Sequence, residues 1–455
     1  MMSDLIVQLQ NALGTDAVVT GDALADRATS YWDPSPTQAR ALLRPDSTEA
    51  VSQALRICHE HGQTVVTHGG LTGVVDGTVT TADDIIMSLE KMSSIESVDD
   101  VGGTAVVQAG TILQTVQEEL ADRDFLFPLD FGARGSCTIG GAVATNAGGI
   151  NVLRYGMMRN QVLGLEAVLA DGTVISSMNQ MLKNNTGYDL KQLFIGSEGT
   201  LGVVTRVVVR LFPLPASQQT ALVALESFDS VVSLLKILHS ELAGTLSAFE
   251  VMWNNYFHHV TAEGHHRAPL ERDYPFYVLL EAQGADAVPD QERFNLIMEQ
   301  ALKDGLIVDA VIPKSETERR TLWDIREVFD PVLPAYLYDV SLPIKDMEAY
   351  VEQLEAAMTD RWPNVVCNVF GHIADGNLHL FFNPGEEGDN RAECDEVVYG
   401  CLDAFEGSVS AEHGIGVEKR QWLKNSRSPQ EIQLMHSLKQ VMDPDNLLNP
   451  GKIFE

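Results

Sequence analysis

The hydrophobic and polar positions at the start of the chain alternate between short strand-like runs and one helical period. Residues 1–35 are predicted to form helix and turn, and residues 39–44 and 64–67 are typical of short strands. Between these strands, apolar residues recur at the spacing of one helix face, namely Val51, Ala54, Leu55 and Cys58. Asp46 and Glu49 have the spacing of a capping box, and Gly62 is expected to end the helix. The pattern predicts a βαβ-type unit.

Further strand-like runs continue up to a pair of prolines. They cover residues 85–89, 105–108, 162–169 and 201–211, and glycine-rich loops separate them. Pro213 and Pro215 then mark the expected domain edge.

Beyond this edge the pattern predicts a second domain. Strand-like runs cover residues 221–225, 246–252 and 276–281, and a helix is expected near residues 290–303. Another helix is expected to point four apolar side chains toward the core, namely Val231, Val232, Leu235 and Leu238. A sheet covered by helices on one face is the expected packing, so the predicted fold class is α+β. The end of the chain is predicted to be mostly helical.

Length, charge and cysteine content narrow the class of protein. The 455 residues are about three times the length of an average domain, so two or three packed units are expected. A net charge of −33 argues against nucleic acid and bare membrane as partners, because both are polyanionic. No apolar run approaches the ~18 residues of a membrane span, and the start lacks the pattern of a signal peptide. Five cysteines without a C-x-x-C pair favour a reduced, cytoplasmic protein.

Two glycine-rich segments, residues 69–73 and 135–149, are candidates for binding a pyrophosphate. Without a Cβ atom, successive residues can turn their N–H groups toward a phosphate that approaches the backbone closely. Neither segment has the G-x-G-x-x-G pattern of a Rossmann site or the pattern of a P-loop. Each segment alone is typical of a structural turn, whereas the two together, with few lysines or arginines nearby, favour a cofactor held by backbone donors.

The sharpest chemistry lies in residues 371–379, where two histidines flank a turn. Residues 365–370 and 378–382 are strand-like, and Asp375-Gly376 is typical of a two-residue hairpin turn. This turn would pair His372 directly with His379, with Cβ atoms about 5 Å apart. Two imidazoles so placed can share one cation such as Zn²⁺. The alternative is a pair of hydrogen-bonded surface histidines.

A carboxylate for the same site lies in the segment Glu412-His413-Gly414-Ile415-Gly416. Glu412 would complete a His₂Glu set and leave an open coordination position for a substrate. If the glycine segments are only turns, these ligands are also compatible with a metal-dependent hydrolase. The residues alone do not decide between this hydrolase and an enzyme that binds a cofactor through the glycine segments.

Several segments resemble the FAD-binding domain of the p-cresol methylhydroxylase / vanillyl-alcohol oxidase superfamily, namely residues 128–130, 135–137, 140–141, 144–149, 153–156 and 169–173. Residues 185–202, NTGYDLKQLFIGSEGTLG, are similar to the D-2-hydroxyglutarate dehydrogenase / D-lactate dehydrogenase branch of this superfamily. The resemblance covers nearly the whole chain from about residue 38 onward.

The resemblance implies four segments: an N-terminal helical segment (1–37), a two-subdomain PCMH-type FAD-binding domain (38–217), an α+β substrate-binding cap with an antiparallel sheet (218–405), and a C-terminal helical segment that returns to the FAD domain (406–455). The residues matched to the FAD site are Gly69, Gly70, Leu71, Thr72, Gly73, Pro128, Gly135, Ser136, Thr138, Gly140, Gly141, Ala144, Thr145, Asn146, Gly148, Tyr155, Gly156, Glu198, Gly202, Val203, Val204 and Asn449. Because His68 precedes the first glycine loop, FAD is expected to be non-covalent.

The resemblance also implies roles for the residues of the second site. The positions of His372, His379 and Glu412 would hold a divalent metal, expected to be zinc, and His413 would be the base. Asn377 would touch the substrate, and Arg326 would bind its α-carboxylate, which a guanidinium can hold bidentately. The implied reaction is FAD-dependent oxidation of a D-2-hydroxy acid to the 2-oxo acid. The metal would polarise the hydroxyl, and the hydride would pass to flavin N5.

One departure from the branch concerns the substrate. The enzymes specific for 2-hydroxyglutarate carry a threonine and a lysine for the distal carboxylate, and the positions matched to them hold Asp330 and Leu337. An anion beside Asp330 without a lysine is disfavoured. A small or apolar-tailed acid such as D-lactate is therefore the favoured substrate, with D-2-hydroxyglutarate as the alternative. The electron acceptor (an electron-transfer flavoprotein, a quinone or a cytochrome) and a homodimer are left open.

Overall fold

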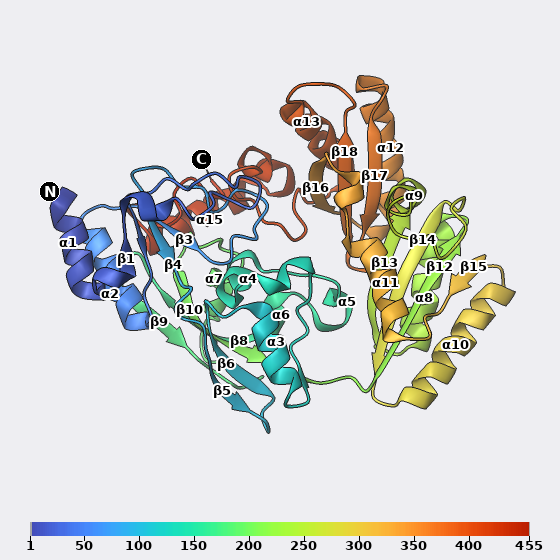
Figure 1. Cartoon of the computed structure of the whole chain (residues 1–455), viewed down its shortest axis with the longest axis horizontal. Coiled ribbons are helices and arrows are strands. Elements are labelled where there is room, and N and C mark those ends of the chain that lie inside the picture. The colour runs from blue at the N-terminus through green and yellow to red at the C-terminus, as the bar shows by residue number, and fades with distance from the viewer. Residues whose placement is uncertain (1, 455) are drawn as a thin grey trace. The chain divides into compact units, whose positions relative to one another are not determined.

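The computed structural model describes residues 2–454, which fold into two compact units (Figure 1). Unit 1 contains the residues up to Gly149, Gly156–Leu214 and the residues from Glu412 onward, and unit 2 contains Ile150–Tyr155 and Pro215–Ala411. The chain passes from unit 1 to unit 2 between Leu214 and Pro215, at the edge expected from Pro213 and Pro215, and returns to unit 1 after Ala411, whereas the resemblance implies edges after residues 217 and 405. The predicted α+β class is confirmed.

The first sheet of unit 1 has four strands in the order β1-β2-β4-β3. They are β1 Val18–Val19, β2 Ala41–Leu43, β3 Val65–His68 and β4 Ile85–Ser88. Helix α2 (Thr48–Glu60) connects β2 to β3, and both strands run parallel to β4 between them, so the predicted βαβ unit is confirmed. Strand β1 pairs antiparallel with β2 and lies in the segment predicted to be helix and turn.

Helix α2 buries the predicted apolar face, and its cap differs from the predicted one. Val51, Ala54, Leu55 and Cys58 are all fully or almost fully buried, and helix α1 (Met2–Leu13) packs beside α2. The Ala50 N–H donates to Ser47 Oγ at 3.3 Å, so Ser47 is the N-cap and the predicted box of Asp46 and Glu49 is wrong. Ser47 is extended and its hydroxyl competes successfully for the cap position.

The second sheet of unit 1 is antiparallel, with five strands in the order β5-β6-β10-β8-β9. They are β5 Ile95–Asp99, β6 Thr104–Gln108, β8 Val162–Val168, β9 Val174–Ser177 and β10 Val203–Arg210. Helices α3 (Leu113–Ala121) and α4 (Ile139–Thr145) contribute to the same core, in which Val107 of β6 and Val207 of β10 are fully buried.

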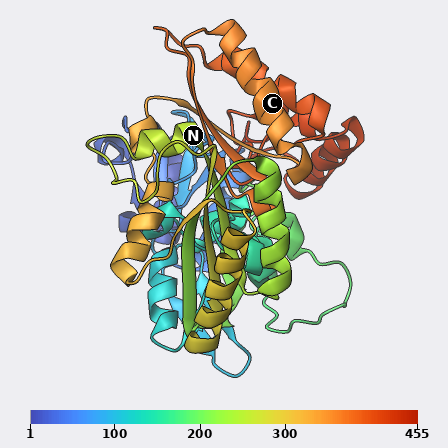
Figure 2. The same ribbon diagram turned by 90° about the vertical axis from the view of Figure 1, so that its right-hand side faces the viewer.

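The remaining strands and α-helices of unit 1 are β7 Phe125–Leu126, α6 Met158–Gln161, α7 Lys191–Phe194, β11 Phe212–Pro213, α14 Leu423–Ser426 and α15 Pro429–Met442. Residues 178–190 form the long green loop seen outside the packed elements in Figure 2. The end of the chain returns to the first sheet, where the Asn449 N–H donates to the carbonyl of Val65 at 2.8 Å.

Unit 2 contains a seven-stranded antiparallel sheet in the order β15-β12-β14-β13-β17-β18-β16, so the antiparallel sheet expected for the cap is confirmed. Its strands are β12 Ser217–Leu225, β13 Leu246–Trp253, β14 Phe276–Gly284, β15 Asp309–Val311, β16 Tyr336–Ser341, β17 Val366–Gly371 and β18 Asn377–Asn383. Its helices are α5 Val152–Tyr155, α8 Phe228–Glu241, α9 Asn254–Val260, α10 Ala287–Lys303, α11 Glu316–Glu327, α12 Met347–Arg361 and α13 Arg391–Leu402. On α8, Leu234 is fully buried and the predicted Val232 only partly.

Helices cover both faces of this sheet, so the predicted single covered face is wrong. Phe228 of α8 packs against Phe276 with ring centroids 5.9 Å apart, and Phe257 of α9 stacks on Tyr277 at 3.6 Å. Because Phe276 and Tyr277 are neighbours in β14, their side chains point to opposite faces. Figure 2 shows α8 and α10 side by side over the first of these faces.

The cysteines and helices bear on two further expectations. All five cysteines are free and buried, as expected of a chain without a disulfide framework. Within residues 2–454, no helix combines the length and the apolar composition that crossing a bilayer requires.

Candidate active site

The two histidines expected to bind metal lie on the β17–β18 hairpin, but its register differs from the predicted one. His379 pairs with Phe370, not with His372. The connection is longer than two residues, because Ile373–Asp375 form a 3-10 turn and the Asn377 N–H donates to the carbonyl of His372 at 3.2 Å. Ile373 is fully buried. Because the chain turns at Ile373 to place this side chain in the core, His372 lies outside the strand. The predicted pairing of His372 with His379 is therefore wrong.

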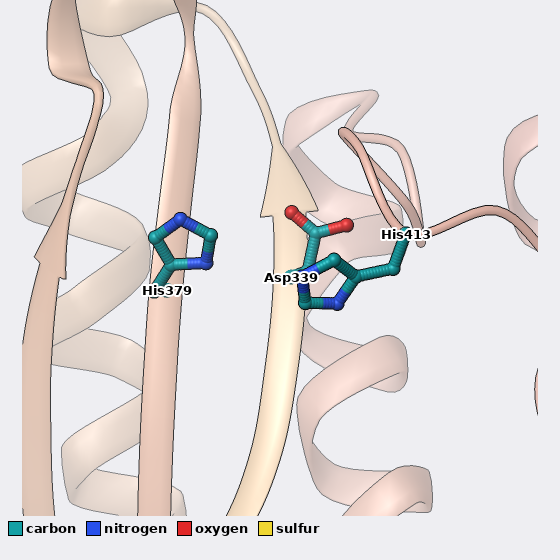
Figure 3. Close-up of side chains that lie close together, drawn as sticks. All are labelled: Asp339, His379 and His413. Atoms are coloured by element: carbon teal, nitrogen blue, oxygen red, sulfur yellow. The ribbon is translucent and has the colours of Figure 1, made fainter. Parts of the chain in front are cut away.

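The two imidazoles nevertheless lie together. Their ring centroids are 5.3 Å apart with 76° between the planes, and His372 and His379 are only 7% and 8% exposed. Figure 3 shows His379 on β18 next to Asp339 on β16, which is its partner in the strand register. Two buried imidazoles at this spacing can provide nitrogen ligands for one divalent cation.

A buried carboxylate that the sequence analysis missed connects His372 to Arg326. Glu250 of β13 is 1% exposed, and its Oε1 accepts a hydrogen bond from His372 Nδ1 at 2.6 Å. Its Oε2 accepts one from Arg326 Nε at 2.8 Å. Burial raises the pKa of a carboxyl group, but the interactions with His372 and Arg326 outweigh burial here and hold the pKa of Glu250 below its ordinary value.

Arg326 lies in the last turn of α11 and is almost completely buried. Its guanidinium stacks over the ring of Phe370 at 4.5 Å from the centroid, and Nη2 lies 3.5 Å from His372 Nε2. Because Nε is bound to Glu250, the terminal nitrogens are the ones that can face a ligand. A buried guanidinium held in this way can bind a carboxylate bidentately.

Asn377 and Asp339 form a second buried pair beside the hairpin. Asn377 Nδ2 donates to Asp339 Oδ1 at 2.8 Å and to the carbonyl of Val340 at 3.1 Å. Asn377 Oδ1 is buried and accepts no hydrogen bond from the part of the chain that the structure describes. An acceptor left without a donor in this position is suited to a substrate hydroxyl or a bound cation.

Asp339 also fixes the point where the chain leaves unit 2. Its Oδ2 accepts hydrogen bonds from Ser410 Oγ at 3.2 Å and from the Ala411 N–H at 3.0 Å. Glu412 and His413 follow directly, and consecutive Cα atoms are only about 3.8 Å apart. Asp339 therefore holds the chain directly before the two predicted site residues. The sequence analysis did not identify Asp339.

The segment after Ala411 belongs to unit 1, where Glu198 holds it. Glu198 accepts hydrogen bonds from the N–H groups of Ile415 and Gly416, each at 2.7 Å. Burial raises the pKa of Glu198, against the effect of these bonds. At Gly416, whose φ is +51°, a Cβ atom would lie 2.0 Å from the carbonyl oxygen of Val75, so only glycine fits. Glu412 Oε1 accepts a hydrogen bond from the Gly149 N–H at 2.9 Å.

Unit 1 contains a pocket lined by residues of the glycine segments, of strand β3 and of the second sheet. The predicted FAD residues that line it are Gly69, Thr138, Gly140, Gly141, Ala144, Glu198, Gly202, Val203, Val204 and Asn449. The sequence analysis missed five further lining residues, namely Thr67, His68, Leu89, Ala109 and Gly199. Thr67 and His68 are the last residues of strand β3. Their position directly before the first glycine segment could have identified them as residues of the FAD site.

The other predicted FAD residues do not line this cavity, namely Gly70, Leu71, Thr72, Gly73, Pro128, Gly135, Ser136, Thr145, Asn146, Gly148, Tyr155 and Gly156. Gly70 packs against the second glycine segment, where a Cβ atom would lie 1.8 Å from the carbonyl oxygen of Ser136. Tyr155 belongs to unit 2, and its hydroxyl donates to Gln283 Oε1 at 3.0 Å.

The cavity has the features of a site for a cofactor held by backbone donors. Thr67 Oγ1 is buried and has no hydrogen-bond partner among the described residues, although it belongs to the lining. The Thr67 N–H donates to Asn449 Oδ1 at 2.9 Å, and Asn449 Nδ2 donates to the carbonyl of Glu198 at 2.7 Å. Asn449 thus connects strand β3 to the motif at residues 185–202. This residue, predicted to bind FAD, also holds these two segments together.

Replacing Gly70 by alanine is expected to separate the two glycine segments and reduce FAD binding. The new methyl group has no room beside the Ser136 carbonyl, and overpacking of this kind costs about 1–3 kcal/mol. The ratio of FAD to protein and the melting temperature should both fall. Gly77→Ala is the matched control, because a Cβ atom at Gly77 meets nothing within 4 Å and Gly77 is not among the residues matched to the FAD site. Equal FAD content in both variants would contradict the prediction.

Comparison with known families decides the class of protein. Residues 39–177 match the family described as FAD binding domain, and residues 214–453 match the family described as FAD linked oxidases, C-terminal domain. The chain belongs to the FAD-linked oxidase family. This FAD-linked oxidase therefore carries its FAD-binding part over the two glycine segments and its oxidase part over the histidine hairpin, and the family resemblance noted in the sequence is confirmed.

Relatives of this FAD-linked oxidase align over most of their length. The mitochondrial D-2-hydroxyglutarate dehydrogenase of Rattus norvegicus is 41% identical over 91% of this chain and 78% of the relative. The D-2-hydroxyglutarate dehydrogenase of Xanthomonas citri is 38% identical over 94% and 91% of the two chains. A mitochondrial protein of Schizosaccharomyces pombe that is provisionally named D-lactate dehydrogenase is 38% identical over 91% and 82%.

Solved structures support the fold of this FAD-linked oxidase. An alkyldihydroxyacetonephosphate synthase has a TM-score of 0.75 at 16% identity and covers 98% of this chain and 84% of its own. Substrate-bound p-cresol methylhydroxylase has a TM-score of 0.72 at 17% identity, with 99% and 96% covered. At these identities the likeness concerns the fold alone.

Proposed function

We propose that this FAD-linked oxidase is a dehydrogenase of D-2-hydroxy acids. The observation that carries the proposal is the buried cluster of His372, His379, Glu250 and Arg326 in unit 2, because it combines two metal-type ligands with a carboxylate-binding guanidinium. A 2-hydroxy acid has a hydroxyl and a carboxylate on neighbouring carbons, and this cluster provides partners for both. The names of the relatives point to the same substrate class.

The match to the FAD-binding family assigns FAD to unit 1, and we propose that it is bound without a covalent bond. His68 is fully buried, and both ring nitrogens are occupied: Nδ1 accepts from Arg27 Nε at 3.1 Å, and Nε2 donates to the carbonyl of Thr78 at 2.8 Å. Burial and the nearby Arg27 lower the pKa of His68 to about 3. An imidazole engaged in this way is not available to attach a flavin, so acid precipitation should release the FAD.

A divalent cation fits the donor set of His372, His379 and Glu412, and zinc is the cation we propose. Two imidazoles and one carboxylate, with a position left for substrate, match catalytic zinc sites. Asp339 holds the chain one residue before Glu412 and so supports this set. The alternative of a metal-dependent hydrolase treats the glycine segments only as turns, and membership of the FAD-linked oxidase family removes that premise.

Three side chains have separate roles in the proposed reaction. Arg326 would bind the α-carboxylate, and Asn377 Oδ1 would accept a hydrogen bond from the substrate. His413 would take the proton of the hydroxyl, for which an imidazole has a suitable pKa. When bound, the cation polarises the hydroxyl and FAD accepts the hydride. The burial of Arg326, His372 and Asn377 excludes water from these contacts.

D-2-hydroxyglutarate is the first substrate to test, because most of the named relatives are D-2-hydroxyglutarate dehydrogenases. This differs from the D-lactate favoured by the sequence. One observation still favours a short or apolar side chain as the second candidate. Asp330 is exposed at the start of a 3-10 turn, and Leu337 packs against the apolar cluster of unit 2, so neither supplies a positive charge.

The test is anaerobic bleaching of the flavin by a panel of D- and L-2-hydroxy acids. We expect the D isomers to bleach it and the L isomers not to, with kcat/KM ranking D-2-hydroxyglutarate against D-lactate. In the double variant Asp330→Thr, Leu337→Lys, the preference for D-2-hydroxyglutarate should rise by about 10–100-fold, because a charge-assisted hydrogen bond contributes about 1.5–3 kcal/mol. A flavin that no hydroxy acid bleaches would refute the proposed function.

A further inference from the structure

Glu250 lies between His372, a proposed metal ligand, and Arg326, the proposed anchor for the substrate carboxylate. It lies in the middle of β13, which is flanked in the sheet by β14 and β17. Each of its carboxylate oxygens accepts one hydrogen bond, Oε1 from His372 and Oε2 from Arg326. One rigid group thus fixes the distance between a metal ligand and a carboxylate anchor.

The hydrogen bond to His372 determines which ring nitrogen can bind a metal. A carboxylate only accepts hydrogen bonds, so Nδ1 of His372 carries the proton. Nε2 is then the nitrogen with a lone pair. A carboxylate that holds a metal-binding histidine in this way fixes its tautomer and ring orientation and raises the basicity of the ligand nitrogen.

The hydrogen bond to Arg326 orients the guanidinium and offsets its charge. Glu250 binds Nε, and the ring of Phe370 supports the guanidinium plane. Arg326 Nη2 lies 3.5 Å from His372 Nε2, so a cation held by His372 would have a positive charge close by. The negative charge of Glu250 reduces this repulsion, because a buried charge without a counter-charge is strongly unfavourable.

We propose that Glu250 is a positioning residue that sets the spacing between the metal-binding nitrogen of His372 and the guanidinium of Arg326. The inference rests on the proposed function and deepens it. A fixed spacing suits substrates whose hydroxyl and carboxylate are on adjacent carbons, which defines a 2-hydroxy acid. Glu250 acts through its two neighbours and does not itself need to contact the substrate.

The decisive variant is Glu250→Gln, which keeps the size of the side chain but has a single acceptor oxygen. Arg326 is always charged and is expected to retain that oxygen. The amide NH₂ group then faces His372 Nδ1, so the imidazole must accept there and carry its proton on Nε2. We expect the affinity for Zn²⁺, measured by titration of the metal-free holoenzyme, to fall by about 10–100-fold with an unchanged ratio of FAD to protein.

Glu281→Gln is the matched control. Glu281 is a buried carboxylate on the neighbouring strand β14 that accepts hydrogen bonds from Arg319 and Trp323 of the same helix α11. Its replacement should loosen unit 2 without changing the tautomer of His372, so Zn²⁺ affinity should stay within about twofold of wild type, against the 10–100-fold loss expected for Glu250→Gln. Glu250→Asp keeps both acceptor oxygens and should recover part of the affinity lost in Glu250→Gln.

Two results would overturn the inference: a Glu250→Gln variant with wild-type Zn²⁺ affinity, or an equal loss of Zn²⁺ affinity in Glu281→Gln. Neither result depends on turnover. A wild-type protein whose flavin no hydroxy acid reduces would refute the proposed function instead, while the Zn²⁺ titrations would still decide the role of Glu250.

Discussion

The variant His413→Ala is expected to reduce its flavin about 10²–10⁴ times more slowly than wild type, which is the contribution of a well-placed general base. FAD content should not change, because His413 does not line the cavity of unit 1. The segment that carries it is held independently on both sides, by Asp339 at Ala411 and by Glu198 at Ile415 and Gly416. The measurement is anaerobic stopped-flow reduction by the best substrate of the panel.

His265→Ala serves as the control for this variant, because His265 is an exposed histidine of unit 2 far along the sequence from the hairpin. It should reduce its flavin at the wild-type rate. Loss of FAD in His413→Ala would assign a structural role to His413. A rate within about threefold of wild type, well below the effect of a general base, would mean that another group takes the proton.

The metal ligands could be predicted from the sequence, but the hairpin register could not. Asp375-Gly376 correctly indicates the turn, and Gly376 does adopt a positive φ of 93°. The turn consists of more residues than the dipeptide because Ile373 is buried in the core. The turn residues alone do not reveal that a neighbouring residue will be buried in the core. The two imidazoles therefore lie close together without being directly paired across the strands.

Glu250 and Asp339 escaped the sequence analysis because their roles depend on strand order. Glu250 is separated from His372 by 122 positions, and only the placement of β13 next to β17 brings them together. A signal existed in both cases, since each is a single acidic residue within an apolar strand, Phe249-Glu250-Val251 and Tyr338-Asp339-Val340. A charge in a buried strand needs a partner, although the sequence does not identify it.

The sequence of strand β14 could also have predicted that helices cover both faces of the sheet in unit 2. Strand β14 begins Phe276-Tyr277-Val278-Leu279-Leu280, with no polar residue between the apolar ones. A half-exposed strand alternates apolar and polar residues, whereas a continuous apolar run indicates burial on both sides. The prediction of a single covered face relied on fold class and did not use this periodicity.

Removing the divalent metal is expected to slow flavin reduction by about 10²-fold or more, since the charge stabilisation that a metal supplies amounts to several kcal/mol. His413 would then have to take the proton of an unpolarised alcohol, whose pKa is far above that of an imidazole. FAD should remain bound, because the cavity of unit 1 contains none of the proposed ligands. The measurement is flavin reduction after exhaustive chelation and again after addition of Zn²⁺.

The variant His379→Ala distinguishes a catalytic metal from a metal that only stabilises the cap. His379 supplies one of two buried imidazoles, and its replacement leaves Glu250, His372 and Arg326 connected to one another. Added Zn²⁺ should restore flavin reduction in the chelated wild type but not in His379→Ala, while both proteins keep their FAD, because His379 does not line the cavity of unit 1. Full activity after chelation, with metal analysis showing no residual ion, would contradict the role of the metal and leave Arg326 and His413 as the groups that act on the substrate.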